Sequence, residues 1–318
     1  MIKHRRRKTF IYLIPKKRGK QFEKCTELII IEEFIKLNHI IIPIRKFYVI
    51  NIILQLLTKR IDGIIVNSIK ILWNNKLILK FKKITPIYWW YFDNPFLKKK
   101  NHIKSILLAK QVSIYFNKHF KSFNEYKKNG IKPIWLDQGI TSKYIFIKSK
   151  KYKYDIIFLG SLNAMHDDRT KILKKIDDNF NLTIFTPSIK KFKKLNFKHI
   201  LPPISHNKIS SIVAQTKITL VLNATITEDY CWSNRIHIML GSGAFCLTDY
   251  IKGLENSYEN EKDCIFINNL DQIDEKIKFW LDEKMTKKRN EIRLNGYNKA
   301  HEKHSYENRI KSMISHID

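Results

Sequence analysis

The chain has few cysteines, and their spacing excludes the usual cysteine-based sites. The four cysteines of this 318-residue sequence are Cys25, Cys231, Cys246 and Cys264. No two of them have C-x-x-C spacing, and no histidine pattern of the metal-binding kind lies beside them. We therefore expect neither a disulfide framework nor a metal site, and we expect the protein to work in a reducing compartment.

Long apolar runs are also missing. The basic residues 1–8 resemble the start of a signal peptide, but the apolar run that follows, residues 10–14, is too short for the core of one. Residues 47–57 form a longer apolar stretch, which contains Asn51 and Gln55 and is about half the length of a membrane span. We expect no transmembrane segment and a cytoplasmic protein.

Acidic residues are scarce relative to basic ones. The sequence has 29 Asp and Glu against 60 Lys and Arg, a net charge of +31, and only 11 of the basic residues are Arg. A strongly A/T-rich coding sequence favours Lys, Ile and Asn, so part of this charge reflects composition alone. However, residues 1–150 carry a net charge of +25 and residues 151–318 only +6. A positive field on one half favours an anionic partner: a membrane surface, an acidic glycan or nucleic acid.

The length and the periodicity predict two α/β domains. A chain of 318 residues suits two domains of about 150 residues each. In both halves, short apolar runs alternate with segments of helical periodicity, which predicts two doubly wound, Rossmann-like domains. The expected strands of the first half are residues 9–14, 40–44, 63–67, 87–92, 112–116 and 133–136. Those of the second are residues 155–159, 182–185, 218–222, 245–248 and 264–267.

Two features of the first half are candidates for a site. The basic loop Lys16, Lys17, Arg18 and Gly19 follows the first strand, where a doubly wound sheet opens onto its ligand crevice, although a solvated turn has the same composition. Asp93 follows the aromatic strand 87–92, whose side chains we expect to be mostly core. We expect Asp93 to be a catalytic carboxylate, with a turn-capping role as the alternative.

The second half is organised around residues 229–249, which read DYCWSNRIHIMLGSGAFCLTD. We expect a helix over residues 233–240, a small-residue turn and then the strand 245–248. A helix N-terminus that carries Arg235, near glycines that allow close backbone approach, is suited to binding a phosphate. The alternatives are that the glycines serve only packing and that Arg235 forms a salt bridge to Asp249.

The order of these motifs resembles a known family. Residues 155–161 read DIIFLGS, and Arg169, the WSNR of residues 232–235, the LGSGAFCLT of 240–248, the GLE of 253–255 and the HSYENR of 304–309 follow in order. This pattern resembles the C-terminal half of the GT-B glycosyltransferases, in particular the "glycosyl transferases group 1" branch with its CgeB-like proteins. The resemblance is specific over residues 150–318, and the DQGI of residues 137–140 is similar to the element with which GT-B enzymes leave their first domain.

The resemblance implies two Rossmann-like domains that face a cleft, with the C-terminal helix crossing back to the first domain. It divides the chain into an acceptor-side domain, residues 1–148, and a nucleotide-sugar-binding domain, residues 149–318. It implies transfer of a sugar from a nucleotide diphosphate to a glycan, lipid-linked or surface acceptor, without a metal and without a cofactor besides the donor. The position at a membrane surface is an alternative to a freely cytoplasmic one.

The resemblance also assigns roles to residues. Asp93, Asp229 and Arg235 are the expected catalytic residues, and Lys16, Lys17, Arg18 and Gly19 the expected acceptor-side residues. The expected donor-binding residues are Gly160, Ser161, Arg169, Asn223, Trp232, Ser233, Asn234, Gly241, Gly243 and Glu255. Among them, Arg235 and Arg169 bind the diphosphate, Ser233 or Asn234 caps the helix, and Trp232 stacks on the base.

The chain departs from the wider GT-B pattern at one point. Retaining enzymes often have a second acid about seven residues after the first, and here that position falls near Ile238. Ribose binding then passes to Glu255, and both stereochemical outcomes stay open. His206 and His237 can titrate, but a core histidine is more often structural. The alternative functions are a glycosyltransferase acting on hydroxymethylated DNA bases and a catalytically silent GT-B binding protein.

Overall fold

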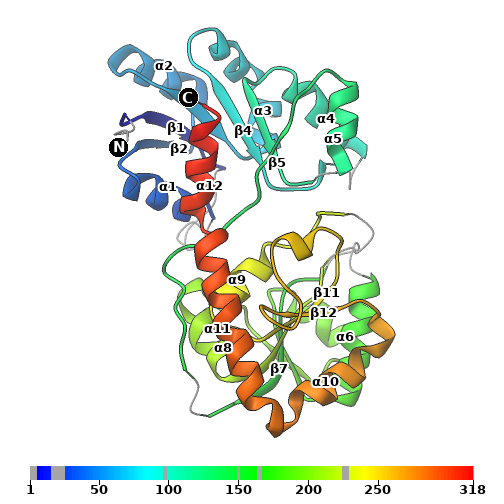
Figure 1. The fold of residues 1–318 in the computed structure, drawn as a ribbon. Helices are drawn as coiled ribbons and strands as arrows, with labels where there is room; N and C mark the ends of the chain where they lie inside the picture. The colour runs from blue at the N-terminus through cyan, green and yellow to red at the C-terminus, as the bar shows by residue number, and fades with distance from the viewer. Residues whose placement is uncertain are drawn as a thin grey trace. The chain divides into compact units, whose positions relative to one another are not determined.

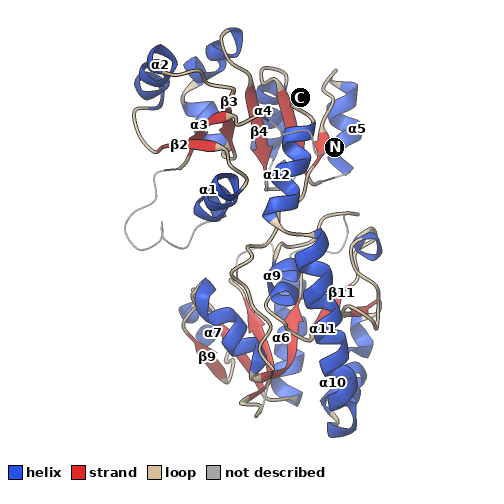
Figure 2. Cartoon of the chain, turned by 60° about the vertical axis from the view of Figure 1, so that its left-hand side comes forward, coloured by secondary structure: helices blue, strands red, loops and turns tan. Residues whose placement is uncertain are grey.

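A computed structural model describes residues 6–15, 26–95, 99–119, 121–148, 151–162, 167–223 and 229–317. The chain divides into two compact units, Met1–Gln138 with Tyr306–Asp318, and Gly139–Ser305 (Figure 1). Each unit contains one six-stranded sheet, in which all paired strands are parallel. Helices cover the sheets, so the prediction of two Rossmann-like α/β domains is confirmed (Figure 2).

The sheet of the first unit has the strand order β2-β1-β3-β4-β5-β6. Its strands are β1 (Thr9–Leu13), β2 (Ile40–Ile44), β3 (Gly63–Val66), β4 (Ile87–Tyr91), β5 (Ile114–Asn117) and β6 (Ile134–Trp135). Its helices are α1 (Thr26–Lys36), α2 (Tyr48–Thr58), α3 (Ile69–Asn74), the 3-10 helix η2 (Lys76–Lys83), α4 (Lys99–Ala109), α5 (Lys121–Lys128) and α12 (Tyr306–Ser315). The order reverses between β1 and β3, and the carboxyl ends of those strands are where a doubly wound sheet forms its crevice.

The aromatic strand β4 lies at the centre of this unit, and its predicted core role is confirmed. All five residues of β4 are buried, because a parallel strand has helices on both of its faces. Trp89 packs against Tyr115 on one side, with ring centroids 4.7 Å apart. Trp90 faces the other side, where its ring lies 6.1 Å from that of Tyr306 in α12.

The C-terminal helix α12 is part of the first unit although it is last in the sequence. It lies beside α1, as both ribbon views show (Figures 1 and 2). Its apolar residues Tyr306, Ile310, Met313 and Ile314 are buried in one cluster with α1 and the sheet. Because these residues recur every three or four positions, one face of α12 completes the core of a unit that begins some three hundred residues earlier in the chain.

The sheet of the second unit has the order β12-β11-β10-β7-β8-β9. Its strands are β7 (Tyr154–Leu159), β8 (Leu182–Phe185), β9 (His199–Leu201), β10 (Thr216–Val221), β11 (Cys246–Asp249) and β12 (Ile265–Ile267). Its α-helices are α6 (Asp167–Asn179), α7 (Ile189–Lys194), α8 (Ile209–Ala214), α9 (Arg235–Gly241), α10 (Ile273–Leu281) and α11 (Thr286–Lys303), with short 3-10 helices η4 (His206–Lys208), η5 (Leu254–Asn256), η6 (Leu270–Gln272) and η7 (Glu283–Met285). Here the order reverses between β7 and β10, which places the expected crevice at their carboxyl ends.

The units divide at Gln138, ten residues before the expected boundary at residue 148. Residues 139–147 belong to the second unit because they bond to its later segments. The Ile140 N–H donates to the His304 carbonyl over 2.9 Å, and the Arg293 guanidinium donates to the Ile147 carbonyl over 3.2 Å. The return of residues 306–318 to the first unit also differs from a simple division into two halves.

Helix α11 is the longest described helix, and sequence periodicity did not predict it. Its buried face carries Arg289, Arg293, Gly296 and Ala300, with Ile292 as a buried aliphatic residue. One guanidinium nitrogen of Arg289 donates to the carbonyls of Trp280 and Asp282 over 2.6 and 2.8 Å, and these bonds stabilise the buried charge. A helix that buries arginines and a glycine has no apolar stripe, so hydrophobic periodicity could not reveal it.

We expect Ile310→Ala to destabilise the first unit. Ile310 is fully buried in α12, and removing a buried Ile side chain costs about 2–5 kcal/mol through lost burial and the cavity left behind. The measurement is urea unfolding followed by tryptophan fluorescence. Ile35→Ala, at a position 58% exposed, is the matched control and should change the free energy of unfolding by less than about 0.5 kcal/mol. Equal effects of the two variants would contradict the packing of α12.

Candidate functional site

Arg235 lies at the carboxyl edge of the second sheet, where β7 and β10 end. It is the first residue of α9, and its guanidinium donates to the Leu159 carbonyl and the Leu222 carbonyl, both over 2.7 Å. Its Nε donates to the Ser233 hydroxyl over 3.1 Å. These three contacts use one N–H of each nitrogen, so two of the five guanidinium N–H groups remain for a ligand.

Arg169 reaches the same place from α6. One of its guanidinium nitrogens donates to the Leu222 carbonyl over 3.3 Å, and another donates to the Ser161 carbonyl over 2.5 Å. The Cζ atoms of Arg169 and Arg235 lie 5.4 and 5.2 Å from the centroid of the Phe158 ring. The structure therefore brings both predicted phosphate-binding arginines to the point where the strand order reverses, with one shared carbonyl.

The pKa values of the two arginines show that both charges are unfavourably placed in the absence of an anion. Burial lowers the pKa of Arg169 to about 9, and the nearby Arg235 lowers it further, while Asp249 opposes both effects. Burial likewise lowers the pKa of Arg235 to about 10, against the attraction of Asp249. An anion bound beside both guanidinium groups would relieve this repulsion, as a diphosphate does.

Asp249, the last residue of β11, is the buried carboxylate of this site. Its oxygens accept from the backbone N–H of Asn223 over 2.9 and 3.1 Å and from the Asn223 amide over 2.5 Å. Burial raises the pKa of Asp249 from 3.8 to about 6, although the bonds from Asn223 and the charge of Arg235 lower it. Within the described residues, Arg235 and Asp249 form no ion pair shorter than 4.0 Å, so the salt-bridge alternative is wrong.

Asn223 was expected to contact the donor, but its side chain forms hydrogen bonds to other residues of the protein. Its amide nitrogen donates to Asp249, and its amide oxygen accepts from the Ser233 N–H over 2.6 Å. It thereby connects the end of β10 to the segment before α9. Asn223 follows the buried strand β10 as predicted, and its side-chain partners are Asp249 in β11 and Ser233 before α9.

The Gly160-Ser161 turn is shaped by the arginines. A Cβ atom on Gly160 would lie 2.5 Å from the Arg235 guanidinium and 2.7 Å from the Phe158 ring. The glycine is therefore required for the guanidinium to reach the Leu159 carbonyl, and the Ser161 carbonyl holds Arg169.

Ser233 and Asn234 precede α9, and only Ser233 acts as a cap. The Ser233 hydroxyl accepts from the backbone N–H of Arg235 over 3.3 Å as well as from its side chain. Asn234 makes no capping bond, and its amide donates to the Gly139 carbonyl over 3.3 Å. The side chain of Ser233 thus positions the guanidinium and begins the helix.

Gly241 and Gly243 were expected to admit a ligand, and the structure contradicts this. Gly241 is the last residue of α9 and Gly243 lies between α9 and β11, so both lie at the opposite edge of the sheet from the arginines. A Cβ on Gly241 would lie 2.4 Å from the Ile140 side chain, and Gly243 has a φ of 79° with its Cβ direction filled by Phe146. Their role is packing, which was the alternative interpretation.

Trp232 was expected to stack on a base, but it is only 4% exposed. Its indole N–H donates to His237 Nε2 over 3.3 Å, and the His237 ring stacks on His304 with centroids 4.6 Å apart. Tyr258 bonds to the other nitrogen of His237 over 2.7 Å. This aromatic cluster is core, and it explains His237 as a structural histidine.

Asp229 and Glu255 are both exposed. Asp229 lies in a turn, and Glu255 lies in the short helix η5, which follows β11. Asp229 approaches Lys252 with a carboxylate–ammonium distance of 3.7 Å, and Glu255 accepts from the Gly253 N–H over 2.7 Å. Tyr230, which sequence reasoning missed, has a φ of 57° and covers Gly253. Asp229 and Glu255 therefore stay candidates for contacts to the donor. Hydrogen bonds within the protein hold the segments that carry them.

The first unit has its own cavity at the carboxyl edge of its sheet. The cavity, about 560 Å³, lies at the ends of β1, β3 and β4 and is lined by Pro15, Asn67 and Asp93 among others. Asp93 is exposed there, whereas Asn67 is buried and donates to the Glu27 carboxylate over 3.3 Å. Asn67 and Glu27 were not predicted, although Asn67 directly follows a buried strand.

The expected acceptor-side loop, Lys16, Lys17, Arg18 and Gly19, lies outside the described residues. Within the described ranges, no group of three His, Cys, Asp or Glu side chains is arranged to hold a metal ion.

Comparison with known proteins agrees with this geometry. Residues 169–315 match the family described as glycosyl transferase-like. The matched range includes Arg169, Arg235 and Asp249. No curated protein matches the sequence significantly. The match confirms the resemblance to glycosyltransferases for this part of the chain, while the CgeB-like branch stays a prediction.

Solved structures show the fold of the whole chain. The Anabaena HepE complex with UDP and glucose has a TM-score of 0.69 at 13% identity and covers 97% of this chain and 100% of its own. Sucrose-phosphate synthase from Thermosynechococcus elongatus has a TM-score of 0.70 at 9% identity, over 97% and 98% of the two chains. An α-glucosyltransferase in complex with UDP-glucose and abasic DNA has a TM-score of 0.71 at 12% identity, over 98% of both chains. The predicted GT-B fold is confirmed.

The pKa of Asp249 predicts a pH-dependent stability. Its folded pKa of about 6 lies above the ordinary 3.8, so its contribution is most favourable below pH 3.8 and is lost as the pH rises through 6. Between pH 4 and pH 7, urea unfolding should show that the wild type loses on the order of 3 kcal/mol more than Asp249→Asn. The exposed Asp178→Asn is the control and should follow the wild type. Parallel curves for wild type and Asp249→Asn would contradict the assignment.

Proposed function

We propose that this protein is a glycosyltransferase that binds the diphosphate of a nucleotide sugar between Arg169 and Arg235. The observation that supports this most is the convergence of two guanidinium groups on the Leu222 carbonyl, at the crevice of a Rossmann-like sheet. The family match over residues 169–315 and the UDP complexes of structural neighbours point to the same ligand class.

The chemistry of sugar transfer needs a fixed positive charge at this position. An acceptor hydroxyl attacks the anomeric carbon, the bond from that carbon to the phosphate oxygen breaks, and negative charge grows on the departing diphosphate. Guanidinium groups that are already held by backbone carbonyls stabilise this charge without reorganising. Arg169 and Arg235 are held in this way by Leu159, Ser161 and Leu222.

These two cations take the role that a metal ion has in other transferases, and we propose that the reaction needs neither a metal nor a cofactor besides the donor. The exposed residues Asp229, in a turn, and Glu255, in η5, are the candidates for contacts to the hydroxyl groups of the donor. The hexosyltransferase character stays part of this proposal, in line with the glucose donors of the neighbours.

The cavity of the first unit is the candidate acceptor site, with Asp93 as the base. Asp93 is exposed at the rim of a cavity of about 560 Å³ that would hold a sugar-sized group. In an inverting reaction the acceptor hydroxyl must lose its proton as the new bond forms, and a carboxylate that faces the acceptor can accept it. In a retaining reaction, a departing phosphate oxygen takes the proton and Asp93 only orients the acceptor.

A second candidate acceptor is DNA. Two structural neighbours are glucosyltransferases that modify or bind DNA, and residues 1–150 carry a net charge of +25. A hydroxymethylated base in duplex DNA would meet this charge through its phosphates. Glycan and lipid-linked acceptors fit the same field when they are acidic.

The proposal is tested by a thermal-shift screen of the full chain with UDP, GDP, ADP, CMP and dTDP, followed by nucleotide-sugar hydrolysis with each nucleotide that stabilises it. A ligand that binds only the folded protein raises its apparent stability. Stabilisation by one diphosphate with sugar release identifies the donor class. Stabilisation without any hydrolysis or transfer would indicate the catalytically silent binding protein, and no response at all would contradict the proposal.

We expect Arg235→Gln to weaken binding of the stabilising diphosphate about 10- to 100-fold, because a charged hydrogen bond to phosphate is lost. Isothermal titration calorimetry measures the change. Gly160→Ala is a second variant, which keeps the charge but places a Cβ within 2.5 Å of the guanidinium, and it should weaken binding in the same direction. The exposed Arg60→Gln should bind normally. Unchanged affinity in Arg235→Gln, with a normal melting temperature, would refute the phosphate assignment.

We expect Asp93→Asn to lower kcat for transfer by about 10²- to 10⁴-fold if Asp93 is the base, with the affinity for the diphosphate unchanged. Steady-state transfer and calorimetry separate the two effects. Glu125→Gln, at a partly buried position of α5, is the control. EDTA should leave the wild-type rate unchanged, since the proposed cations are arginines. A variant that transfers sugar at the wild-type rate would exclude Asp93 as the base.

A further inference from the structure

Helix α2 of the first unit is apolar on both of its faces. Ile52 is fully buried against the sheet, and Tyr48, Val49 and Leu56 pack beside it. The opposite face is formed by large apolar side chains in contact with solvent: Phe47 (75% exposed), Ile50 (61%), Ile53 (41%), Leu54 (51%) and Leu57 (77%). We call these five residues the α2 face.

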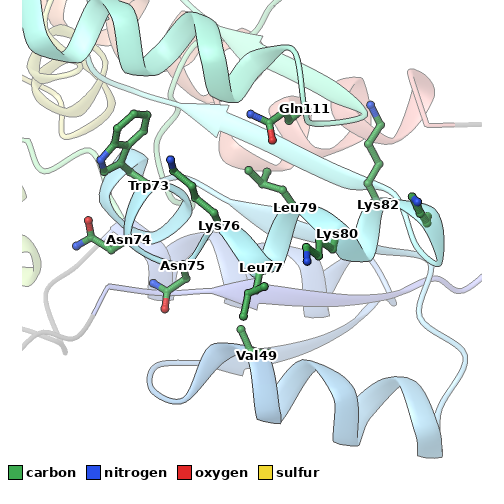
Figure 3. Close-up of a pocket in the computed structure, with 11 residues that line it drawn as sticks. Val49, Trp73, Asn74, Asn75, Lys76, Leu77, Leu79, Lys80, Lys82 and Gln111 are labelled. Carbon is green, nitrogen blue, oxygen red and sulfur yellow. The ribbon is translucent and has the colours of Figure 1, made fainter.

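The α2 face is unusual for a protein surface. The 11 residues of α2 include no charged side chain, whereas the outer face of a helix on a soluble domain is normally polar. Leu77 in η2 is 54% exposed, and Val49 and Leu77 point toward one another from the two elements (Figure 3). Large exposed apolar patches with polar rims mark surfaces that bind a partner or a membrane.

The segment that carries this patch is strongly basic. Residues 45–83 contain nine Lys and Arg, and Asp62 is the only acidic residue among them. The Asp62 carboxylate already accepts from the Thr9 N–H over 2.7 Å. Exposed basic residues flank α2 on both sides, Arg45 and Lys46 before it and Lys59 and Arg60 after it.

A basic groove adjoins the α2 face. It has a volume of about 900 Å³, and Val49 of α2 contributes to its wall together with Trp73, Lys76, Lys80 and Lys83 (Figure 3). The Lys76 ammonium lies 4.7 Å from the centroid of the Trp73 ring. A groove of this size and sign suits a phosphate-bearing head group beside an apolar surface.

We propose that the α2 face binds the surface of an anionic lipid bilayer, with α2 lying in the plane of the membrane. The flanking residues Arg45, Lys46, Lys59 and Arg60 and the groove residues Lys76, Lys80 and Lys83 form the basic rim of this surface. An apolar face inserts among acyl chains while Lys and Arg attract anionic head groups. At 1.5 Å per residue the helix is only about 16 Å long, roughly half the thickness of the hydrocarbon core. None of the helices in the described ranges has the length and apolar character of a membrane span.

Charge and chemistry favour a membrane over the two other occupants, a second copy of this chain and nucleic acid. A symmetric dimer through the α2 face would bring the flanking basic residues of two copies together, and like charges oppose that contact. Nucleic acid would satisfy the basic rim, but its phosphate backbone leaves five exposed aliphatic and aromatic side chains in water. Of the three, only an anionic membrane offers both apolar contacts to the α2 face and negative charge to the basic residues beside it.

The test is flotation of the full chain with phosphatidylcholine vesicles that contain 30% phosphatidylglycerol, and with pure phosphatidylcholine vesicles, at 0.1 and 0.5 M NaCl. We expect binding to the anionic vesicles at low salt and weaker binding at high salt, because salt screens exposed charges. This assay uses no nucleotide sugar, so its outcome is independent of the proposed function.

Matched variants separate the two parts of the surface. The first is the α2 variant, Ile50→Gln with Leu54→Gln and Leu57→Gln, which should lower the partition coefficient at least about tenfold. Its control is Ile35→Gln with Ile103→Gln and Leu107→Gln, at positions that are exposed outside the α2 face, and it should not lower the coefficient. Lys76→Gln with Lys80→Gln and Lys83→Gln should lower it on the order of 100-fold at 0.1 M NaCl. Lys190→Gln with Lys193→Gln and Lys194→Gln, the same charge change on α7, should have little effect.

Three outcomes would overturn the inference. One is equal vesicle binding by the α2 variant and its control. Another is salt-sensitive binding of a 30-base-pair duplex, lost in the η2 lysine variant, with no binding to anionic vesicles. The last is a wild-type dimer in analytical ultracentrifugation that the α2 variant dissociates, again without vesicle binding. Circular dichroism and melting curves establish that each variant is folded.

Discussion

The carbonyl oxygen of Leu222 is the point on which the second unit's site depends. Leu222 directly follows β10 at the reversal of strand order, and both Arg169 and Arg235 donate to its carbonyl oxygen. Burial lowers the pKa of both arginines, and the nearby charge of Arg235 lowers the pKa of Arg169 further. They stay together because backbone carbonyls, the Phe158 ring and the nearby charge of Asp249 stabilise them. This preorganised arrangement supports the proposed binding of an anion between the two guanidinium groups.

Several neighbouring residues are best understood as consequences of that arrangement. Gly160 has no side chain because the guanidinium of Arg235 occupies the space of a Cβ. Asn223 joins Asp249 to Ser233, and Ser233 in turn accepts from Arg235. A change at Asn223 would therefore act on ligand binding through Arg235, without touching the ligand.

The two units use the same architecture for different chemistry. Both sheets reverse their strand order in the middle, and both present polar groups at the carboxyl ends there. In the second unit these groups are arginines held by carbonyls, which suit a diphosphate. In the first they are Asp93, Asn67 and Glu27 around a cavity, which suit hydroxyl groups. The basic groove beside the α2 face adjoins this cavity, because Trp73 and Asn74 line both.

Sequence reasoning predicted every strand except β9, because buried parallel strands are short apolar runs between turns. It missed α11, whose buried face carries Arg289 and Arg293, and it misplaced Gly241, Gly243 and Trp232. The motif WSNR and the glycines are neighbours in sequence, yet α9 separates them and places the glycines at the other edge of the sheet. A motif shows which residues belong together in the chain, and the direction of the helix between them decides which meet a ligand.

The amino-acid sequence alone determined the two α/β domains, the asymmetry of charge and the resemblance to GT-B glycosyltransferases, because these follow from local periodicity, composition and motif order. The tertiary structure decided that α12 completes the first unit, that Arg169 and Arg235 share a carbonyl, and that α2 exposes an apolar face. Each of these depends on which distant segments pack together. That packing is a property of the folded chain, which no local pattern in the sequence contains.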